Sequence, residues 1–188
     1  AISAIDCCCF VSTASSNSGT NTASITCIIP FDASMSVDVT WDSFKNTFPS
    51  ITSIATLDPD YMGFIFWKHS LRNISIKIPK LKKKIKKTGV FVNSSIKQIV
   101  KIIEEENLHA VQLHGDETPE FCSKLIKLKR VEVIKAFNIS NSFNFSKLKL
   151  FEDSCDFFLF DTKGKLPGGN GLVFDWSILK NYKYKKPF

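Results

Sequence analysis

From about residue 58 onward, short apolar runs alternate with amphipathic segments, and this alternation constrains the fold more than any other feature. The apolar runs lie at 61–67, 88–93, 109–115, 131–137 and 155–161. Segments with helical character lie between and after them, at 78–87, 94–107, 118–129, 142–153 and 175–182. Near-continuous apolar strands are typical of sheets that are covered on both faces. The sequence therefore predicts an α/β fold with parallel strands.

Two of the helical segments carry clear signals. The segment 118–129 opens with Thr118, a residue that caps helices, and Pro119 stands at the first helical position. In 94–107 the isoleucines and valine recur three and four residues apart and fill one face. Both patterns predict helices that pack one apolar side against a sheet.

Lysine-rich runs at 80–87 and 180–186 carry much of the net charge of +7. Ile78, Leu81 and Ile85 lie three and four residues apart, so we expect a helix with its lysines on a solvated face. The alternative is attraction to the phosphates of a nucleic acid. Because the phenylalanines lie inside strand runs rather than on an exposed stacking platform, we expect no nucleic-acid partner.

Residues 1–57 differ in composition from the rest, with the Ser/Thr-rich stretch 12–24 and no basic residue before Lys45. We expect a divergent or disordered leader at 1–57 and the main domain at 58–188. The start of the chain carries Asp6 and lacks the pattern of a signal peptide. No apolar run is long enough for a membrane span. The six cysteines include no Cys-x-x-Cys pair, which favours a reducing, cytoplasmic location and no bound metal.

Polar residues recur where the strands end. They are Asn93, the group His114 to Glu117, Lys135 and Asp161. The carboxyl ends of parallel strands share one edge, where chemistry gathers in barrels. Asp161 could act there as a general acid or base, or equally serve as a helix cap or loop anchor. The glycines of the following loop, Gly168, Gly169 and Gly171, could let backbone amides approach an anion or let the loop close over a ligand, although many surface turns look the same.

Taken together, several short motifs give a specific resemblance. They are "DPDYMGFIFWKHSLRNIS", "GVFVN", "VQLHGDETPEFC", "VIKAF", "FLFDTK" and "GGNGLVFDW". In this order and spacing they resemble phosphoribosylanthranilate isomerase, an enzyme family of tryptophan biosynthesis, over about residues 54–188. The resemblance implies a (β/α)8 TIM barrel, of which about strands two to six are recognisable. It also implies an Amadori rearrangement of N-(5-phosphoribosyl)anthranilate to 1-(2-carboxyphenylamino)-1-deoxyribulose 5-phosphate, without a cofactor.

The resemblance also implies roles for individual residues. Asp161 matches the general acid that protonates the ring oxygen, and Arg72 matches the arginine that binds the anthranilate carboxylate. A guanidinium group grips a carboxylate in a fork, which suits that role. His114 matches the histidine of the family's Gln-Leu-His-Gly strand end. Gly168, Gly169 and Gly171 match the mobile loop after strand six.

The sequence also departs from the family pattern. The position of the family's strand-one cysteine, its general base, falls near Ser43, and no strands seven and eight are recognisable before Phe188. A serine hydroxyl is a far poorer base than a thiolate. An inactive, truncated remnant of the enzyme is therefore an alternative function, and it would show exposed apolar surface. The oligomeric state is left open by the sequence.

Overall fold

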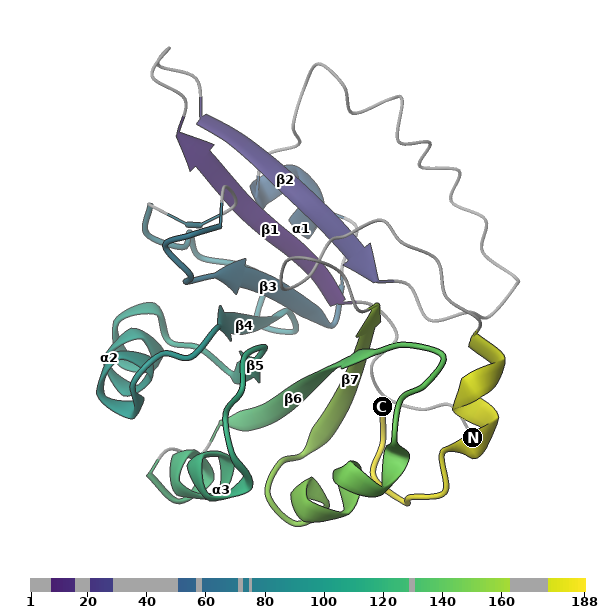
Figure 1. Cartoon of the computed structure of the whole chain (residues 1–188). Coiled ribbons are helices and arrows are strands. Elements are labelled where there is room, and N and C mark those ends of the chain that lie inside the picture. Colours follow the sequence, from purple (N-terminus) through teal and green to yellow (C-terminus); the bar gives the residue numbers. More distant parts are fainter. Residues whose placement is uncertain are drawn as a thin grey trace. The chain divides into compact units, whose positions relative to one another are not determined.

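The computed structural model describes residues 8–15, 21–28, 51–56, 59–70, 73–74, 76–128, 131–162 and 176–188. Two compact units divide the chain, residues 1–89 and residues 90–188 (Figure 1). The boundary falls inside strand β4 (Lys86–Phe91).

The first unit holds strands and one short helix. They are β1 (Cys8–Ser15), β2 (Asn21–Ile28), α1 (Ile51–Ala55) and β3 (Tyr61–Ile65). Strand β1 pairs antiparallel with β2 and parallel with β3. Every residue of β3 is buried, as its continuous apolar run predicts. Part of the segment expected to be a leader thus forms strands, and its separation at residue 57 stays a prediction.

The helix predicted for the lysine-rich segment before β4 is wrong. Residues 77–85 form turns and irregular backbone instead. Ile78 and Ile85 are still buried, at 5% and 1% exposure. Pro79 has no N–H to donate and disfavours helical backbone at the residue before it. The apolar spacing that predicted a helical stripe therefore serves an irregular segment that leads into β4, with the side chains of Lys82, Lys83 and Lys84 exposed.

The second unit contains parallel strands joined through helices. After the end of β4 come α2 (Ile96–Glu106), β5 (Ala110–Leu113), α3 (Pro119–Leu128), β6 (Glu132–Ile139), the 3-10 helix η2 (Phe145–Phe151), β7 (Phe157–Thr162) and the 3-10 helix η3 (Trp176–Asn181). Strand β6 pairs parallel with β5 on one side and β7 on the other. Helix α3 contacts β6 and α2 (Figure 1). The expected parallel α/β architecture is confirmed, while the segments at 142–153 and 175–182 contain 3-10 helices.

Local capping explains where α2 begins and ends and where α3 begins. The Ser95 hydroxyl accepts from the Gln98 N–H, and the Gln98 side chain accepts from the Ser95 N–H. This reciprocal pair satisfies two backbone donors at the start of α2. The helix ends at Asn107, which adopts a left-handed φ of 52°. Thr118 accepts from the Phe121 N–H at 3.3 Å, as expected for a cap of α3.

Aromatic side chains fill the core beside β6 and β7. The ring centroids of Phe137 and Phe158 lie 5.3 Å apart, and those of Phe143 and Phe145 lie 5.1 Å apart, in both cases nearly edge-to-face. The last residues of the chain run along β7, since the Phe158 N–H donates to the Pro187 carbonyl at 3.0 Å. Lys186 holds the same segment by donating to the Cys155 carbonyl at 2.7 Å. The phenylalanine-rich runs thus build a core rather than a stacking surface.

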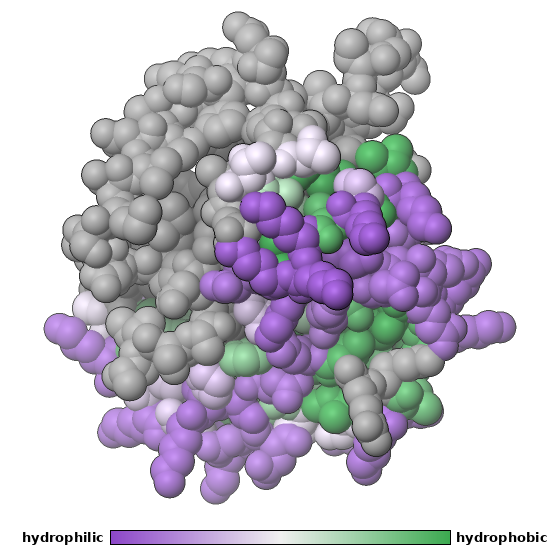
Figure 2. Space-filling model, turned by 180° about the vertical axis from the view of Figure 1, so that it is seen from behind, coloured by the Kyte–Doolittle hydropathy of each residue, from purple (hydrophilic) through white to green (hydrophobic). Residues whose placement is uncertain are grey.

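Hydrophilic side chains cover much of the described surface that Figure 2 shows, with apolar residues between them. Large apolar side chains with substantial exposure are Ile76 at 43%, Leu128 at 52%, Leu150 at 70% and Phe188 at 50%. They come from different segments rather than from one element. Within the described ranges, no helix is both long and apolar enough to cross a membrane.

Candidate functional site

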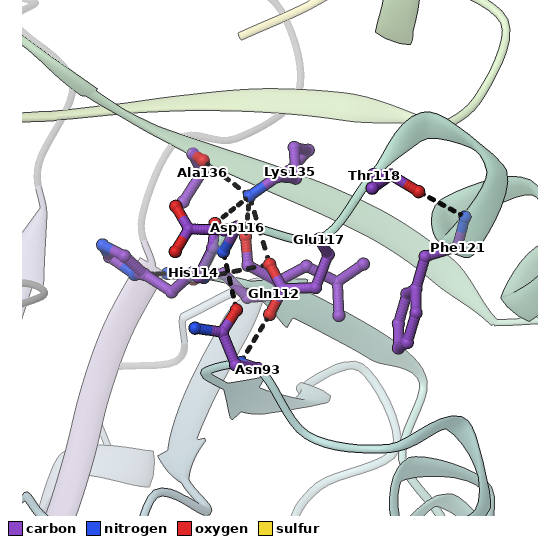
Figure 3. A network of polar contacts seen from close by, with 11 residues as sticks. Asn93, Gln112, His114, Asp116, Glu117, Thr118, Phe121, Lys135 and Ala136 are labelled. Atoms are coloured by element: carbon purple, nitrogen blue, oxygen red, sulfur yellow. Dashed lines mark hydrogen bonds and ion pairs between the residues drawn. The ribbon is translucent and has the colours of Figure 1, made fainter.

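The carboxyl ends of β4 and β5, together with Lys135 of β6, converge in a polar network of the second unit (Figure 3). Asn93 follows β4, residues 114–117 follow β5, and Lys135 lies within β6. Parallel pairing brings these positions together, because Leu113 stands opposite Lys135 in the sheet. The expectation that polar strand ends meet at one edge is confirmed for Asn93 and residues 114–117, whereas Lys135 joins them from within β6, which extends to Ile139.

Glu117 is the acceptor at the centre of the network. Its Oε1 accepts from the Asn93 N–H at 2.8 Å, and its Oε2 accepts from the Gly115 N–H at 2.9 Å. Only 2% of its side chain is exposed. A buried carboxylate needs such donors and a countercharge, because its loss of hydration is costly. Glu117 therefore ties the end of β4 to the turn after β5.

Lys135 supplies the countercharge. Its Nζ lies 3.2 Å from Glu117 Oε2, and 4% of its side chain is exposed. The same ammonium group donates to the carbonyls of Leu113, Gly115 and Ala136 at 3.1, 2.7 and 3.1 Å. With its donors shared among four oxygens, Lys135 acts as a buried structural cation that fixes the strand ends.

Gly115 is required by a close approach of two turns. A Cβ atom built on Gly115 would lie 2.3 Å from Asn93 Oδ1 and 2.8 Å from the Asn93 nitrogen. The contact is held by the Asp116 N–H, which donates to Asn93 Oδ1 at 2.7 Å. Asn93 itself adopts a φ of 50°, a conformation that asparagine tolerates better than most residues. The two turns after β4 and β5 are thus locked face to face.

Gln112, His114 and Asp161 form a second chain of contacts. The Gln112 amide nitrogen lies 2.7 Å from His114 Nδ1, and both residues are buried. His114 Nε2 lies 3.3 Å from Asp161 Oδ2, with 9% and 17% of these side chains exposed. That distance is within reach of a hydrogen bond, but Nε2 completes none in the described structure. Catalytic hydrogen bonds are often poorly aligned before substrate binds, so a carboxylate beside an imidazole can still exchange a proton with a bound molecule.

The thiols in this unit are unsuited to act as bases. Burial raises the pKa of Cys122 to about 11 and that of Cys155 to about 12. The charge of Lys135 opposes the rise at Cys122 but does not outweigh burial. At neutral pH both groups stay protonated, and a thiol is a weak nucleophile and base compared with its thiolate. At the surface, the Thr118 side chain lowers the pKa of Glu120 in the first turn of α3.

The structure brings together only part of the site that the sequence predicts. Asp161 and His114 lie side by side at the ends of β7 and β5. Arg72, Ser43 and the loop glycines Gly168, Gly169 and Gly171 lie outside the described residues. Among the part of the chain that is described, no group of three His, Cys, Asp or Glu could hold a metal ion.

Gln112 was not predicted from the sequence as a site residue, and Glu117 and Lys135 were expected only as polar residues at strand ends. The signal for Gln112 was available, since it precedes His114 by two positions and so lies on the same side of the strand. The buried pair of Glu117 and Lys135 joins the turn after β5 to the interior of β6, and no local sequence pattern predicts it. The partners are separated by 18 residues and meet only through sheet register.

Comparisons with known proteins identify the family of the chain. Residues 45–188 match the family of N-(5'phosphoribosyl)anthranilate (PRA) isomerase, and the match begins earlier than residue 54, where the resemblance was expected to start. An N-(5'-phosphoribosyl)anthranilate isomerase from Phocaeicola vulgatus is 42% identical over 139 residues, which cover 74% of this chain and 67% of that protein. One from Parabacteroides distasonis is 38% identical over 146 residues, covering 74% of this chain and 65% of that protein. The chain thus spans about two thirds of the length of these relatives.

Solved structures of phosphoribosyl anthranilate isomerases resemble the fold of this chain. The phosphoribosyl anthranilate isomerase of Thermotoga maritima aligns with a TM-score of 0.58 at 32% identity, covering 70% of this chain and 65% of that one. The enzyme from Thermus thermophilus gives 0.55 at 25% identity, covering 66% of this chain and 61% of that one. These likenesses confirm the expected α/β fold as part of a (β/α)8 barrel.

Proposed function

Because the chain belongs to the N-(5'phosphoribosyl)anthranilate isomerase family, we propose that it acts in the Amadori rearrangement of N-(5-phosphoribosyl)anthranilate, with Asp161 as the general acid. The observation that carries this proposal is the contact between Asp161 and His114 at 3.3 Å, at the strand ends where such barrels place their chemistry. The substrate is a small phosphosugar joined to anthranilate, and the cytoplasm is the expected location. The proposed rearrangement requires no cofactor.

The reaction begins with ring opening. Asp161 gives its proton to the furanose ring oxygen, the bond from that oxygen to C1 breaks, and the anthranilate nitrogen forms a C=N bond to C1. Removal of the proton from C2 then gives an enolamine, which becomes the ketose. Asp161 is suited to the first step because it lies near the end of β7, and 17% of its side chain is exposed.

The remaining roles rest on the resemblance. Arg72 binds the anthranilate carboxylate, and Gly168, Gly169 and Gly171 form the loop that closes over the substrate. The group that removes the C2 proton is not assigned. The strand-one position expected for it falls near Ser43, and the buried thiols of Cys122 and Cys155 hold their protons up to about pH 11 and 12.

Turnover of N-(5-phosphoribosyl)anthranilate by the full chain tests the proposal, with substrate and ketose product separated by chromatography. We expect Asp161→Asn to lower kcat by about 10²–10⁴-fold, the usual contribution of a general acid. The matched control is Asp153→Asn, because Asp153 is an exposed carboxylate of the same unit. This control should keep the wild-type rate.

Two results would count against the proposal. Near-normal turnover in Asp161→Asn would end the general-acid assignment. Absence of turnover in a wild-type chain that unfolds cooperatively would instead favour the alternative, a remnant of the enzyme without activity. The cooperative transition, followed by circular dichroism in urea, separates that outcome from simple misfolding.

A further inference from the structure

We propose that Gln112 is a positioning residue that fixes the tautomer of His114, so that His114 presents an N–H group to Asp161. The inference rests on the proposed function, because it assigns to this contact a part in the acid chemistry of Asp161. Its structural basis is the chain of contacts from the Gln112 amide through the imidazole ring to the carboxyl group.

The hydrogen-bond partner of His114 Nδ1 determines which of the two ring nitrogens carries the proton. The Gln112 side-chain nitrogen faces His114 Nδ1 at 2.7 Å, and an amide nitrogen donates but does not accept. In this orientation of the amide, Nδ1 accepts and carries no proton. A neutral imidazole has one N–H, which then resides on Nε2. Because Gln112 is 1% exposed and His114 is 8% exposed, water has little access with which to offer an alternative arrangement.

The tautomer of His114 in turn determines which oxygen of the Asp161 carboxyl group carries the acid proton. Nε2 is the ring atom that lies 3.3 Å from Asp161 Oδ2. With an N–H on Nε2, that nitrogen cannot accept a proton from Oδ2. When Asp161 is protonated, the proton therefore resides on Oδ1. Once it has been transferred, the negative charge that forms on the carboxylate lies beside an N–H donor, which stabilises it.

The opposite orientation of the Gln112 amide would reverse this arrangement. Its oxygen would accept from a proton on Nδ1, and Nε2 would become an acceptor that competes with the substrate for the proton of Asp161. In the observed orientation, Gln112 Oε1 is buried without a hydrogen-bond partner among the described residues. The orientation of the Gln112 amide thus determines which ring nitrogen of His114 carries the proton. Substitution of Gln112 should change that tautomer.

Long-range 1H–15N spectra of chain labelled at histidine test the inference without substrate, at an alkaline pH at which an ordinary imidazole is neutral. The sequence has three histidines, and His114→Asn identifies the signals of His114. We expect wild-type His114 to carry its proton on Nε2. Gln112→Met, which keeps an unbranched side chain of similar length, should give a mixture of tautomers. Gln112→Glu, whose carboxylate accepts from Nδ1, should shift the proton to Nδ1.

The signals of His69 and His109 serve as internal controls and should be the same in all these chains. A wild-type His114 protonated on Nδ1, or a tautomer that stays unchanged in a folded Gln112→Met chain, would overturn the inference. In turnover, we expect Gln112→Met to lower kcat about tenfold or more with little change in KM, since the acid acts in the transition state. The tautomer is read without turnover, so an inactive wild-type chain with Nε2–H contradicts the proposed function alone.

Discussion

Lys135 Nζ lies 3.2 Å from Glu117 Oε2, in a pair whose side chains are only 4% and 2% exposed. Removal of one partner leaves the other charge buried, which costs about 3–5 kcal/mol in comparable pairs. We therefore expect Lys135→Met to lower the free energy of unfolding by about that amount. Urea denaturation followed by circular dichroism measures the change.

The exposed pair of Lys101 and Glu105 provides the control for this prediction. Its atoms lie 3.7 Å apart, and its side chains are 71% and 56% exposed. Such surface pairs contribute about 0.2–1 kcal/mol, so Lys101→Met should change stability by less than about 1 kcal/mol. Equal losses in Lys135→Met and Lys101→Met would contradict the assignment of Lys135 as a structural cation.

Gly115→Ala should destabilise the chain, because the added methyl group would approach Asn93 Oδ1 to 2.3 Å. Overpacking of this kind costs about 1–3 kcal/mol. Truncation of the partner should not restore stability, since the Asn93 backbone nitrogen would still lie 2.8 Å from the new Cβ. Thermal melts of Gly115→Ala, Asn93→Ala and the double variant measure this, and full rescue in the double variant would disprove the backbone clash.

The buried thiols predict loss of stability at alkaline pH. Burial raises the pKa of Cys122 from 9.0 to about 11 and that of Cys155 from 9.0 to about 12. The native state therefore binds these protons more tightly than the unfolded chain does. The contribution of the two thiols to the free energy of unfolding is fully present below about pH 9 and is lost as the pH rises toward 11–12. Burial also raises the pKa of Tyr182 to about 12, in the same direction.

Urea midpoints measured between about pH 8 and 10.5 should therefore fall steadily as the pH rises. The fall should be shallower in Cys122→Ala, which removes one of these groups and is compared with wild type over the same pH range. In alkylation with iodoacetamide at about pH 8, peptides containing Cys122 and Cys155 should react slowly in the native chain and rapidly in urea. Rapid native labelling, or midpoints that rise with pH, would show that these thiols are not protonated and buried as described.

Arg72→Ala tests the part of the site that lies outside the described residues. If this arginine holds the anthranilate carboxylate equally in the ground state and the transition state, its loss should raise KM more than it lowers kcat. Arg72→Lys is the matched variant, because lysine keeps the charge but not the fork geometry. A fall in kcat at unchanged KM would contradict a role in uniform binding.

The strands and α-helices of the second unit could be predicted from sequence because their signals are local. The apolar runs match β5, β6 and β7, and Thr118 and Pro119 mark the start of α3. The segment at 77–85 could not, since Ile78 and Ile85 have helical spacing but are buried from irregular backbone. The spacing of apolar residues indicates which side chains are buried. The backbone conformation is determined instead by Pro79 and by the pairing of the following strand.

The candidate site was predictable where motif and strand end coincide. Asp161 and His114 were both expected at one edge, and they lie 3.3 Å apart. The network of Glu117 and Lys135 depends on register, which places Lys135 opposite Leu113 and so brings its ammonium group to Glu117. A contact of that kind arises from pairing between strands that are distant in sequence, so neither composition nor periodicity reports it.

The most direct test of the central claim, that substrate is handled at the edge formed by His114 and Asp161, is to locate where product binds. Chain labelled with 15N at histidine is titrated with 1-(2-carboxyphenylamino)-1-deoxyribulose 5-phosphate and followed by NMR. We expect saturable shifts of the His114 ring signals, with those of His109, which precedes β5 at its other end, unchanged. Saturable binding that leaves His114 unmoved, or that shifts His109 instead, would contradict it.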